Sequence, residues 1–288
     1  PAFTYDIFNY MTTASVTYTQ KENPYIVMPI EIPNEPGLAY TRAANKVGLY
    51  GPAWLLLSWV PHTLGAGNVW QTIFMFKLLI GFFYGLMLYL IFKRTKSLRQ
   101  VIFFGLNPLI LIEVLVSSHN DIVMMVFALL ALGVGLSAGK NVFVRIVAWV
   151  ASIGVKGATV VLLPLVIKPM SDVTMYKVAY WLMFGVFVVV APIREELYPW
   201  YAVWFLTFAA LVPLTKRSFI HGFSVAICLG LSLRHLPYIL TRVYGGVGPL
   251  ARIIFTLVPV FFYCVWYVRS YGARALITSA FHGKKTSD

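Results

Sequence analysis

Apolar residues occur along this chain in long runs that are separated by short polar or basic stretches. The runs lie at 49–64, 69–92, 101–116, 121–138, 142–155, 157–167, 175–192, 200–214, 218–233 and 249–268. A membrane-spanning helix needs about 20 apolar residues, so several of these runs are shorter than a full span. The pattern predicts an all-α, polytopic transmembrane helical bundle with about 8–10 membrane segments, some of them short or re-entrant.

Residues 1–48 have a different pattern. They contain four acidic side chains and, in their second half, four prolines that rule out a continuous helix. We therefore predict a polar loop outside the hydrocarbon, followed by the helical bundle at 49–268 and a basic cytoplasmic tail at 269–288. No soluble linker or repeat interrupts the chain, so we expect a single membrane-embedded domain over 1–288.

Composition excludes a water-soluble enzyme. Hydrophobic residues make up 59% of the 288 positions and charged residues only 11%, against about 25% charged residues in soluble proteins. The net charge of +13 comes from short basic clusters between apolar runs, whereas a nucleic-acid surface would need a basic stripe with interleaved aromatics. The basic residues are thus expected to orient the chain among membrane lipids, without a nucleic-acid partner.

Basic residues are enriched in cytoplasmic loops, and this bias predicts the topology. The clusters at 93–99 and 269–285 are assigned to the cytoplasm, which places 117–121 (SSHND), Lys156, 194–201 (REELYPWY) and 234–242 (RHLPYILTR) outside. A full crossing at 49–64 would put the N-terminal loop and the cluster at 93–99 on the same side of the membrane. The segment 49–64 is therefore predicted to be re-entrant or interfacial. The two short runs at 142–155 and 157–167 are predicted to form a hairpin around Lys156.

Acidic residues are scarce, with ten in the chain, and an ionisable side chain near hydrocarbon is a functional candidate. Asp6, Glu113 and Asp121 all fall on the outer side of the predicted topology. The alternative is structural, with Glu113 and Asp121 pairing with Lys156 or Arg194. The side chain of Asn120 or Asp121 is also expected to cap the helix that begins at Ile122.

A metal site is a weaker hypothesis. One histidine, His119, with one carboxylate has too few ligands for a closed zinc centre. A divalent cation such as Mg²⁺ or Mn²⁺ that bridges a phosphate, with Asp6 and Asp121 as candidate ligands, remains open.

The positive-inside bias favours basic side chains on the cytoplasmic side, so basic side chains on the outer side need another explanation. A bound anion is one candidate. Arginine and lysine bind phosphate, which suggests a lipid phosphate or pyrophosphate. The alternative is that they extend along the apolar surface to the headgroups. The candidates are Lys156, Arg194, Arg234, His235 and Arg242.

Aromatic residues follow the charged triplet that contains Arg194 and Glu195. Trp200 and Tyr201 are candidates to stack on a sugar, with an interfacial aromatic belt as the alternative. For Trp204 the belt is the preferred interpretation.

Four stretches together resemble a known family: YDIFNY followed by ENPY, LYGPAW, NPLILIEVLVSSHNDIVMM and REELYPWYAVW. They are similar to the integral-membrane GT-C glycosyltransferases, in the bacterial branch related to polyprenol-phosphomannose-dependent mannosyltransferases and to the catalytic mannosyltransferase of the GPI pathway. The resemblance covers about residues 5–240.

The resemblance implies a function and a site. The donor would be a polyprenyl-phosphate sugar, the acceptor a lipid, glycan or protein, and the active site would face outward from a multi-pass protein of the bacterial plasma membrane. Asp6 matches the family's catalytic base in the first outer loop, and Asn23, Tyr25 and Tyr50 lie in motifs that would bind substrate. The family's first transmembrane helix precedes that loop, so a truncated N-terminus is expected here.

Direct displacement of a lipid phosphate needs one carboxylate to accept the acceptor's proton and a cationic pocket for the leaving group. It would invert the anomeric carbon. Two other classes stay open: a transporter or flippase of a lipid-linked substrate, which predicts inverted repeats, and a noncatalytic membrane scaffold.

Overall fold

The computed structural model describes residues 4–32, 34–135, 141–168, 170–193, 197–215, 217–241 and 248–281. Throughout these ranges the regular structure is helical and no strand occurs. The predicted all-α fold is therefore confirmed. The chain divides into two compact units, of which the first comprises Pro1–Arg94 and Ile110–Ile167 and the second comprises Thr95–Leu109 and Lys168–Asp288.

The first unit begins with a helix in the stretch that was predicted to be a loop. Three of its threonines satisfy their hydroxyls within the helix: the Thr12, Thr13 and Thr17 hydroxyls donate to carbonyls four residues earlier. This helix can therefore be buried although its sequence looks polar. The proline-rich part after it contains only short 3₁₀ turns. The elements are α1 (Asp6–Tyr18), η1 (Pro29–Glu31), η2 (Leu38–Tyr40), α2 (Pro52–Gly65) and α3 (Val69–Thr95).

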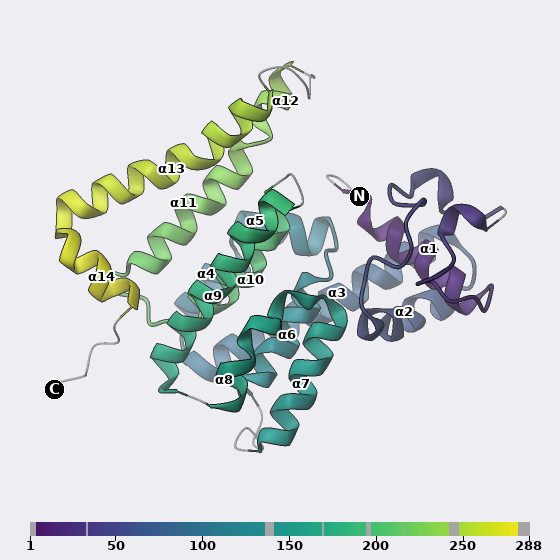
Figure 1. Ribbon diagram of the computed structural model, residues 1–288, viewed down its shortest axis with the longest axis horizontal. Helices are drawn as coiled ribbons and strands as arrows, with labels where there is room; N and C mark the ends of the chain where they lie inside the picture. The colour runs from purple at the N-terminus through teal and green to yellow at the C-terminus, as the bar shows by residue number, and fades with distance from the viewer. Residues whose placement is uncertain are drawn as a thin grey trace. The chain divides into compact units, whose positions relative to one another are not determined.

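The second half of the first unit packs around the core helix α6. Its elements are the π-helical segment η3 (Leu111–Val116), α6 (Asp121–Ala131), α7 (Val142–Val155), η4 (Gly157–Leu162) and α8 (Leu163–Ile167). The short α5 (Pro108–Ile110) leads into η3. In Figure 1, α6, α7 and α8 lie together, as do α1 and α2.

The hairpin predicted around Lys156 is confirmed. Lys156 is extended, with φ −158° and ψ 130°, between α7 and η4. Polar side chains of α7 fasten the two arms: the Trp149 indole N–H donates to the Thr159 carbonyl at 3.0 Å, and the Ser152 and Thr159 hydroxyls lie 2.8 Å apart. The hairpin thus holds Lys156 at a fixed place on its tip.

A glycine contact joins the hairpin to the N-terminal part of the unit. The Gly51 N–H donates to the Val155 carbonyl at 3.2 Å, and a Cβ at Gly51 would collide with the Gly154 carbonyl oxygen. The motif LYGPAW therefore docks α2 against the end of α7, directly before Lys156. At 14 residues, or about 21 Å, α2 is too short to cross the hydrocarbon.

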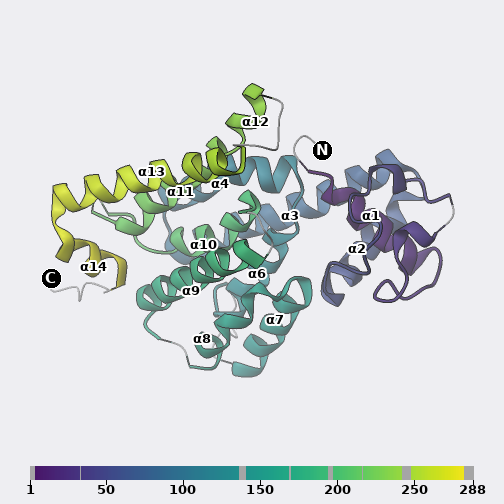
Figure 2. The same ribbon diagram turned by 45° about the horizontal axis from the view of Figure 1, so that its top comes forward.

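The second unit combines the long helices α9 (Asp172–Ile193) and α13 (Gly248–Tyr271) with shorter ones. Its other elements are α4 (Leu98–Gly105), η5 (Pro199–Tyr201), α10 (Ala202–Ala209), α11 (Phe219–Leu233), α12 (Leu236–Thr241) and α14 (Ala273–Phe281). In it α11 lies along α13 and α9 along α10, as Figures 1 and 2 show. The Gln100 amide of α4 donates to the carbonyls of Ala210 and Val212, which close the end of α10.

Three helices in the described ranges are long and apolar enough to cross a membrane: Val69–Thr95, Asp172–Val190 and Leu250–Tyr271. A fourth span results if the bent pair Leu98–Gly105 and Pro108–Val116 makes one crossing. The remaining apolar helices, of 10–17 residues, are shorter than a span, in agreement with the short segments expected from the sequence. The protein is thus a helical membrane protein.

Candidate active site

Asp6 meets the His119–Asn120–Asp121 turn inside the first unit. The His119 Nδ1 atom lies 3.3 Å from Asp6 Oδ2, and its Nε2 atom lies 3.3 Å from Glu113 Oε2. The His119 side chain is fully buried and that of Glu113 nearly so, whereas 25% of the Asp6 side chain is exposed. The structure therefore brings together three predicted site residues in a chain of acid, imidazole and acid whose accessible end is Asp6.

Two local features hold this turn in place. Glu113 sits in the π-helical segment η3, and the His119 N–H donates to the Glu113 carbonyl at 3.1 Å. The Lys77 ammonium of α3 donates to the Val116 carbonyl at 2.8 Å and to the Ser118 hydroxyl at 3.3 Å, next to the positive φ of 64° at Ser118. Short π segments are frequent at functional sites, because they shift side chains out of the regular helical register.

The charges of the cluster fix its protonation states. Burial alone would lower the pKa of His119, but the hydrogen bonds and charges of Asp6 and Glu113 outweigh it and raise the pKa to about 9. Burial works to raise the pKa of Asp6, yet His119 and the nearby charge of Lys156 bring it below its usual value. At neutral pH, Asp6 is therefore an ionised carboxylate that faces a histidinium.

Lys156 and Asp121 form a second ion pair. The Lys156 ammonium lies 2.8 Å from Asp121 Oδ2; the Asp121 side chain is fully buried, and 21% of that of Lys156 is exposed. The structural alternative left open by the sequence is thus present for Asp121, while Glu113 contacts His119. Because Lys156 also influences the pKa of Asp6, the two ion pairs share one region.

The expected side-chain cap at the start of α6 is wrong. The helix begins at Asp121, and the backbone carbonyl of Asn120 accepts the N–H groups of Val123 and Met124. No side-chain hydrogen bond caps it. The reason is burial: Asp121 is engaged by Lys156, and both ends of the Asn120 amide are buried without a hydrogen-bond partner among the described residues.

Tyrosines connect the turn to the N-terminal motifs. The Tyr10 hydroxyl accepts the Asn120 N–H at 3.1 Å, and its ring makes edge contacts, at 4.8 Å between centroids, with Tyr50 and Trp54. Among the predicted substrate-binding residues, Tyr50 is therefore adjacent to the site. Tyr25 bonds through its hydroxyl to the Tyr50 carbonyl at 3.0 Å, and the exposed Asn23 closes a turn by accepting the Tyr25 N–H.

The remaining predicted site residues belong to the second unit or lie outside the described residues. Arg194, Glu195 and Arg242 lie outside them. In the second unit, the Arg234 guanidinium donates to the Leu197 carbonyl, and His235 next to it is exposed. The cluster around His119 consists of first-unit residues.

Aromatic residues of the second unit form a stacked group. Tyr198 stacks on Trp200 at 4.4 Å, and Tyr201 on Trp204 at 4.1 Å between centroids. Trp204 is only 2% exposed, so the membrane-belt interpretation of this residue is wrong, because its ring packs inside the unit.

Sequence reasoning missed three residues that support the site. The Asn9 amide donates to Asp6 Oδ1 at 3.3 Å and accepts the Ala43 N–H at 3.2 Å, so it ties Asp6 to the following loop. Its position three residues after Asp6 was the available signal, since such residues share a helix face. For Tyr10, no sequence feature gave such a signal of a role in the site. Lys77 gave one, as a lone lysine inside a long apolar run.

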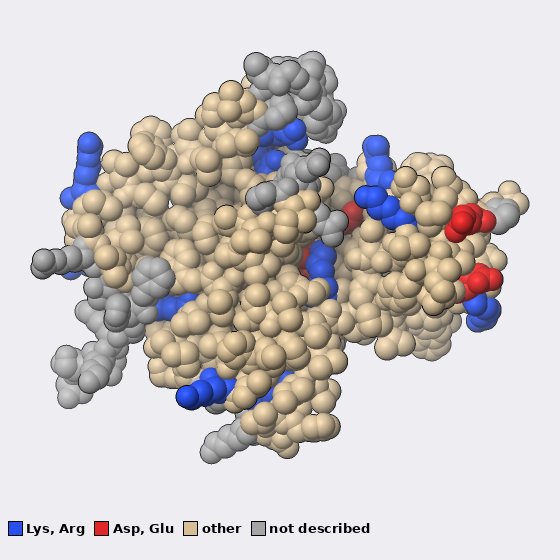
Figure 3. Space-filling model, in the orientation of Figure 1, with Lys and Arg blue, Asp and Glu red and all other residues tan. Residues whose placement is uncertain are grey.

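The described residues contain no group of three or more His, Cys, Asp or Glu side chains placed to hold a metal ion. The two candidate ligands from the sequence, Asp6 and Asp121, are each engaged by a cationic side chain. On the face shown in Figure 3, most of the visible Asp and Glu surface lies over the N-terminal part of the first unit.

Comparison with known proteins gives one family. The family model described as "Alpha-(1->6)-mannopyranosyltransferase, N-terminal domain" matches residues 1–172, which include every residue of the cluster around His119. No curated protein and no solved structure gives a significant match.

Proposed function

This chain belongs to the alpha-(1->6)-mannopyranosyltransferase family and is a glycosyltransferase of the membrane, and we propose that its donor is a polyprenyl-phosphate-linked mannose. The acceptor is the hydroxyl of a lipid or glycan on the outer face of the plasma membrane. The supporting observation is the position of Asp6: an ionised, partly exposed carboxylate at the end of a buried chain of charged groups.

Asp6 acts as the general base in this proposal. Its carboxylate accepts the proton of the acceptor hydroxyl while that oxygen attacks the anomeric carbon of mannose. His119 keeps Asp6 ionised and oriented, and Glu113 keeps His119 protonated, so both are positioning residues. The unpartnered, buried amide of Asn120 is a candidate to bind a sugar hydroxyl in the same region.

Lys156 acts on the leaving group. As the bond between the anomeric carbon and the phosphate oxygen breaks, the electron pair stays on the polyprenyl phosphate, whose charge Lys156 stabilises. Asp121 holds the ammonium in place, and the 21% of the Lys156 side chain that is exposed is the part that a phosphate oxygen would approach. Phosphate is a good leaving group, so a second acid is not needed, and displacement from the opposite face inverts the anomeric carbon.

Donor specificity tests this function. The purified protein in lipid nanodiscs is given a mannose acceptor together with either polyprenyl-phosphate mannose or a nucleotide-linked mannose. We expect transfer from the lipid-linked donor alone, with an anomeric configuration opposite to that of the donor. Transfer from the nucleotide-linked donor alone, or retention of configuration, would contradict the proposal.

A further inference from the structure

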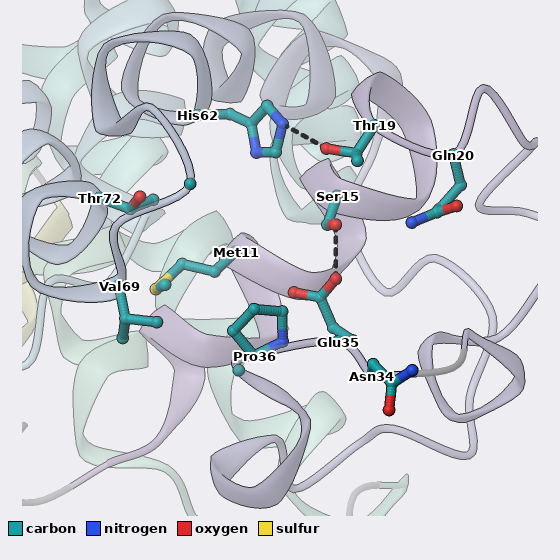
Figure 4. A pocket seen from close by; sticks show the side chains of 12 residues that line it. Met11, Ser15, Thr19, Gln20, Asn34, Glu35, Pro36, His62, Val69 and Thr72 are labelled. Carbon is teal, nitrogen blue, oxygen red and sulfur yellow. Dashed lines mark hydrogen bonds between the residues drawn. The ribbon is translucent and has the colours of Figure 1, made fainter.

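A cavity of about 280 Å³ lies on the other side of α1 from Asp6. At 100° per residue, Ser15 projects from the face of the helix opposite to Asp6, about 13 Å further along the axis. Met11 and Thr19 share the face of Ser15, at intervals of four residues. The loop at 34–37 and the turn between α2 and α3 complete the wall. Figure 4 shows this arrangement.

The polar groups of this pocket are arranged in two pairs. The Ser15 hydroxyl donates to Glu35 Oε2 at 2.6 Å, and the Thr19 hydroxyl lies 3.0 Å from His62 Nε2 (Figure 4). Two further amides, of Gln20 and Asn34, line the cavity. Ser15 is only 7% exposed and Glu35 is half-buried, so the Ser15 end of the first pair is shielded from solvent, which strengthens its hydrogen bond.

Apolar surface completes the lining. Met11, Pro36 and Val69 contribute carbon atoms beside the hydroxyl, amide and carboxylate groups. Small-molecule sites combine an apolar wall with a few placed polar groups, and the volume lies just below their usual range, which begins at about 300 Å³. The lining therefore suits a small ligand with both hydroxyl groups and C–H faces.

The charges of His62 and Glu35 limit which kinds of ligand the pocket can bind. Burial lowers the pKa of His62 from its usual 6.5, Glu35 opposes this and the nearby charge of Lys21 adds to it, so His62 is mainly neutral at pH 7. Glu35 then gives the pocket a negative charge. The carboxylate disfavours direct contact with a phosphate or pyrophosphate, whereas a neutral sugar can donate its hydroxyls to it.

We propose that this pocket binds a neutral sugar residue of a glycan acceptor, remote from the hydroxyl that reacts at Asp6. The inference rests on the proposed function for its acceptor, but the pocket and the Asp6 cluster are made of different residues. Because the two sites lie on opposite faces of α1, one monosaccharide cannot occupy both. The pocket therefore selects acceptors that are several sugar units long.

Binding is measured without catalysis. Calorimetric titration of a linear mannose oligosaccharide and of methyl mannoside into the Asp6→Asn protein should show binding of the oligosaccharide. Adding Glu35→Ala or Ser15→Ala should weaken it about tenfold or more, the effect expected of a lost hydrogen bond to a charged group. The matched control Glu22→Gln changes an exposed carboxylate of the same region and should leave the affinity unchanged.

The outcomes separate the two proposals. Unchanged oligosaccharide affinity in both pocket variants, with melting temperatures that show intact folding, would overturn the pocket assignment, as would the absence of any oligosaccharide binding. Kinetics give the second readout: the pocket variants should raise KM for the oligosaccharide and not for methyl mannoside. Oligosaccharide binding that depends on Glu35, in a protein without transferase activity, would support the pocket and reject the proposed function.

Discussion

The imidazole of His119 contacts the carboxylate of Asp6 through Nδ1, at 3.3 Å, although the two residues lie 113 positions apart in the sequence. With Glu113 on its other nitrogen, His119 has no basic nitrogen left at neutral pH and serves as a buried cation. This relationship supports the proposal that Asp6 is the accessible base, and it leads to the following predictions.

Replacing His119 should shift the pH dependence of catalysis. In His119→Gln the cation that lowers the pKa of Asp6 is gone, so the acidic limb of kcat/KM should move to higher pH. The rate at neutral pH should fall roughly 10- to 100-fold, as expected for the loss of a charge-assisted hydrogen bond worth about 1.5–3 kcal/mol. Complete pH profiles of both proteins measure this; superimposable acidic limbs would contradict it.

The same histidine should make stability depend on pH. Its pKa is raised on folding from 6.5 to about 9, so its stabilising contribution is complete below the unfolded value and is lost as pH rises through about 9. The melting temperature of the wild-type protein should fall over this window. In Glu113→Gln, which lacks one of the two anionic partners, the fall should be smaller. Parallel melting curves in the two proteins would argue against a histidinium.

Lys156 should show separable structural and functional effects. Lys156→Met removes the cation that pairs with the fully buried Asp121 carboxylate, which should cost about 3–5 kcal/mol of stability. The double variant Lys156→Met/Asp121→Asn should recover most of that stability but not the transfer rate. Thermal melting beside donor turnover measures both, and full turnover in the double variant would remove Lys156 from leaving-group stabilisation.

The docking of α2 on α7 should tolerate no side chain at Gly51. Gly51→Ala forces a methyl group against the Gly154 carbonyl and should destabilise the protein by about 1–3 kcal/mol, with a loss of activity because Lys156 follows directly. Gly81→Ala is the matched control, since a Cβ there has open space around it. Equal melting temperatures of the two variants would show that the contact is dispensable.

The sequence predicted the features that follow from the spacing of apolar residues and from the free-energy cost of a charge near hydrocarbon. Apolar runs predicted a helical membrane protein, and the cost of an ionisable group near hydrocarbon singled out Asp6, Glu113 and Asp121. Lys156 was singled out because a basic residue on the outer side opposes the positive-inside bias. The hairpin at Lys156 followed from two short runs around one cation. Each of these inferences needs only local information.

Features that depend on the hydrogen bonds of individual side chains were not predictable. The helix α1 was missed because its threonines bond within the helix, which a polarity pattern cannot reveal. The side-chain cap expected at Asn120 or Asp121 is absent because the turn is buried and Lys156 pairs with Asp121, whereas the expectation assumed an exposed helix start. The pairing of Ser15 with Glu35, 20 residues apart, exists only once the loop has folded over α1.

The central claim is that Asp6 is the base of mannosyl transfer, and the most direct measurement is the initial rate of Asp6→Asn with saturating polyprenyl-phosphate mannose. Loss of a general base lowers the rate about 10²- to 10⁴-fold, and we expect a fall of that size with the melting temperature and donor affinity retained. Glu22→Gln should keep the wild-type rate. A folded Asp6→Asn protein that transfers mannose as fast as the wild type would contradict the account.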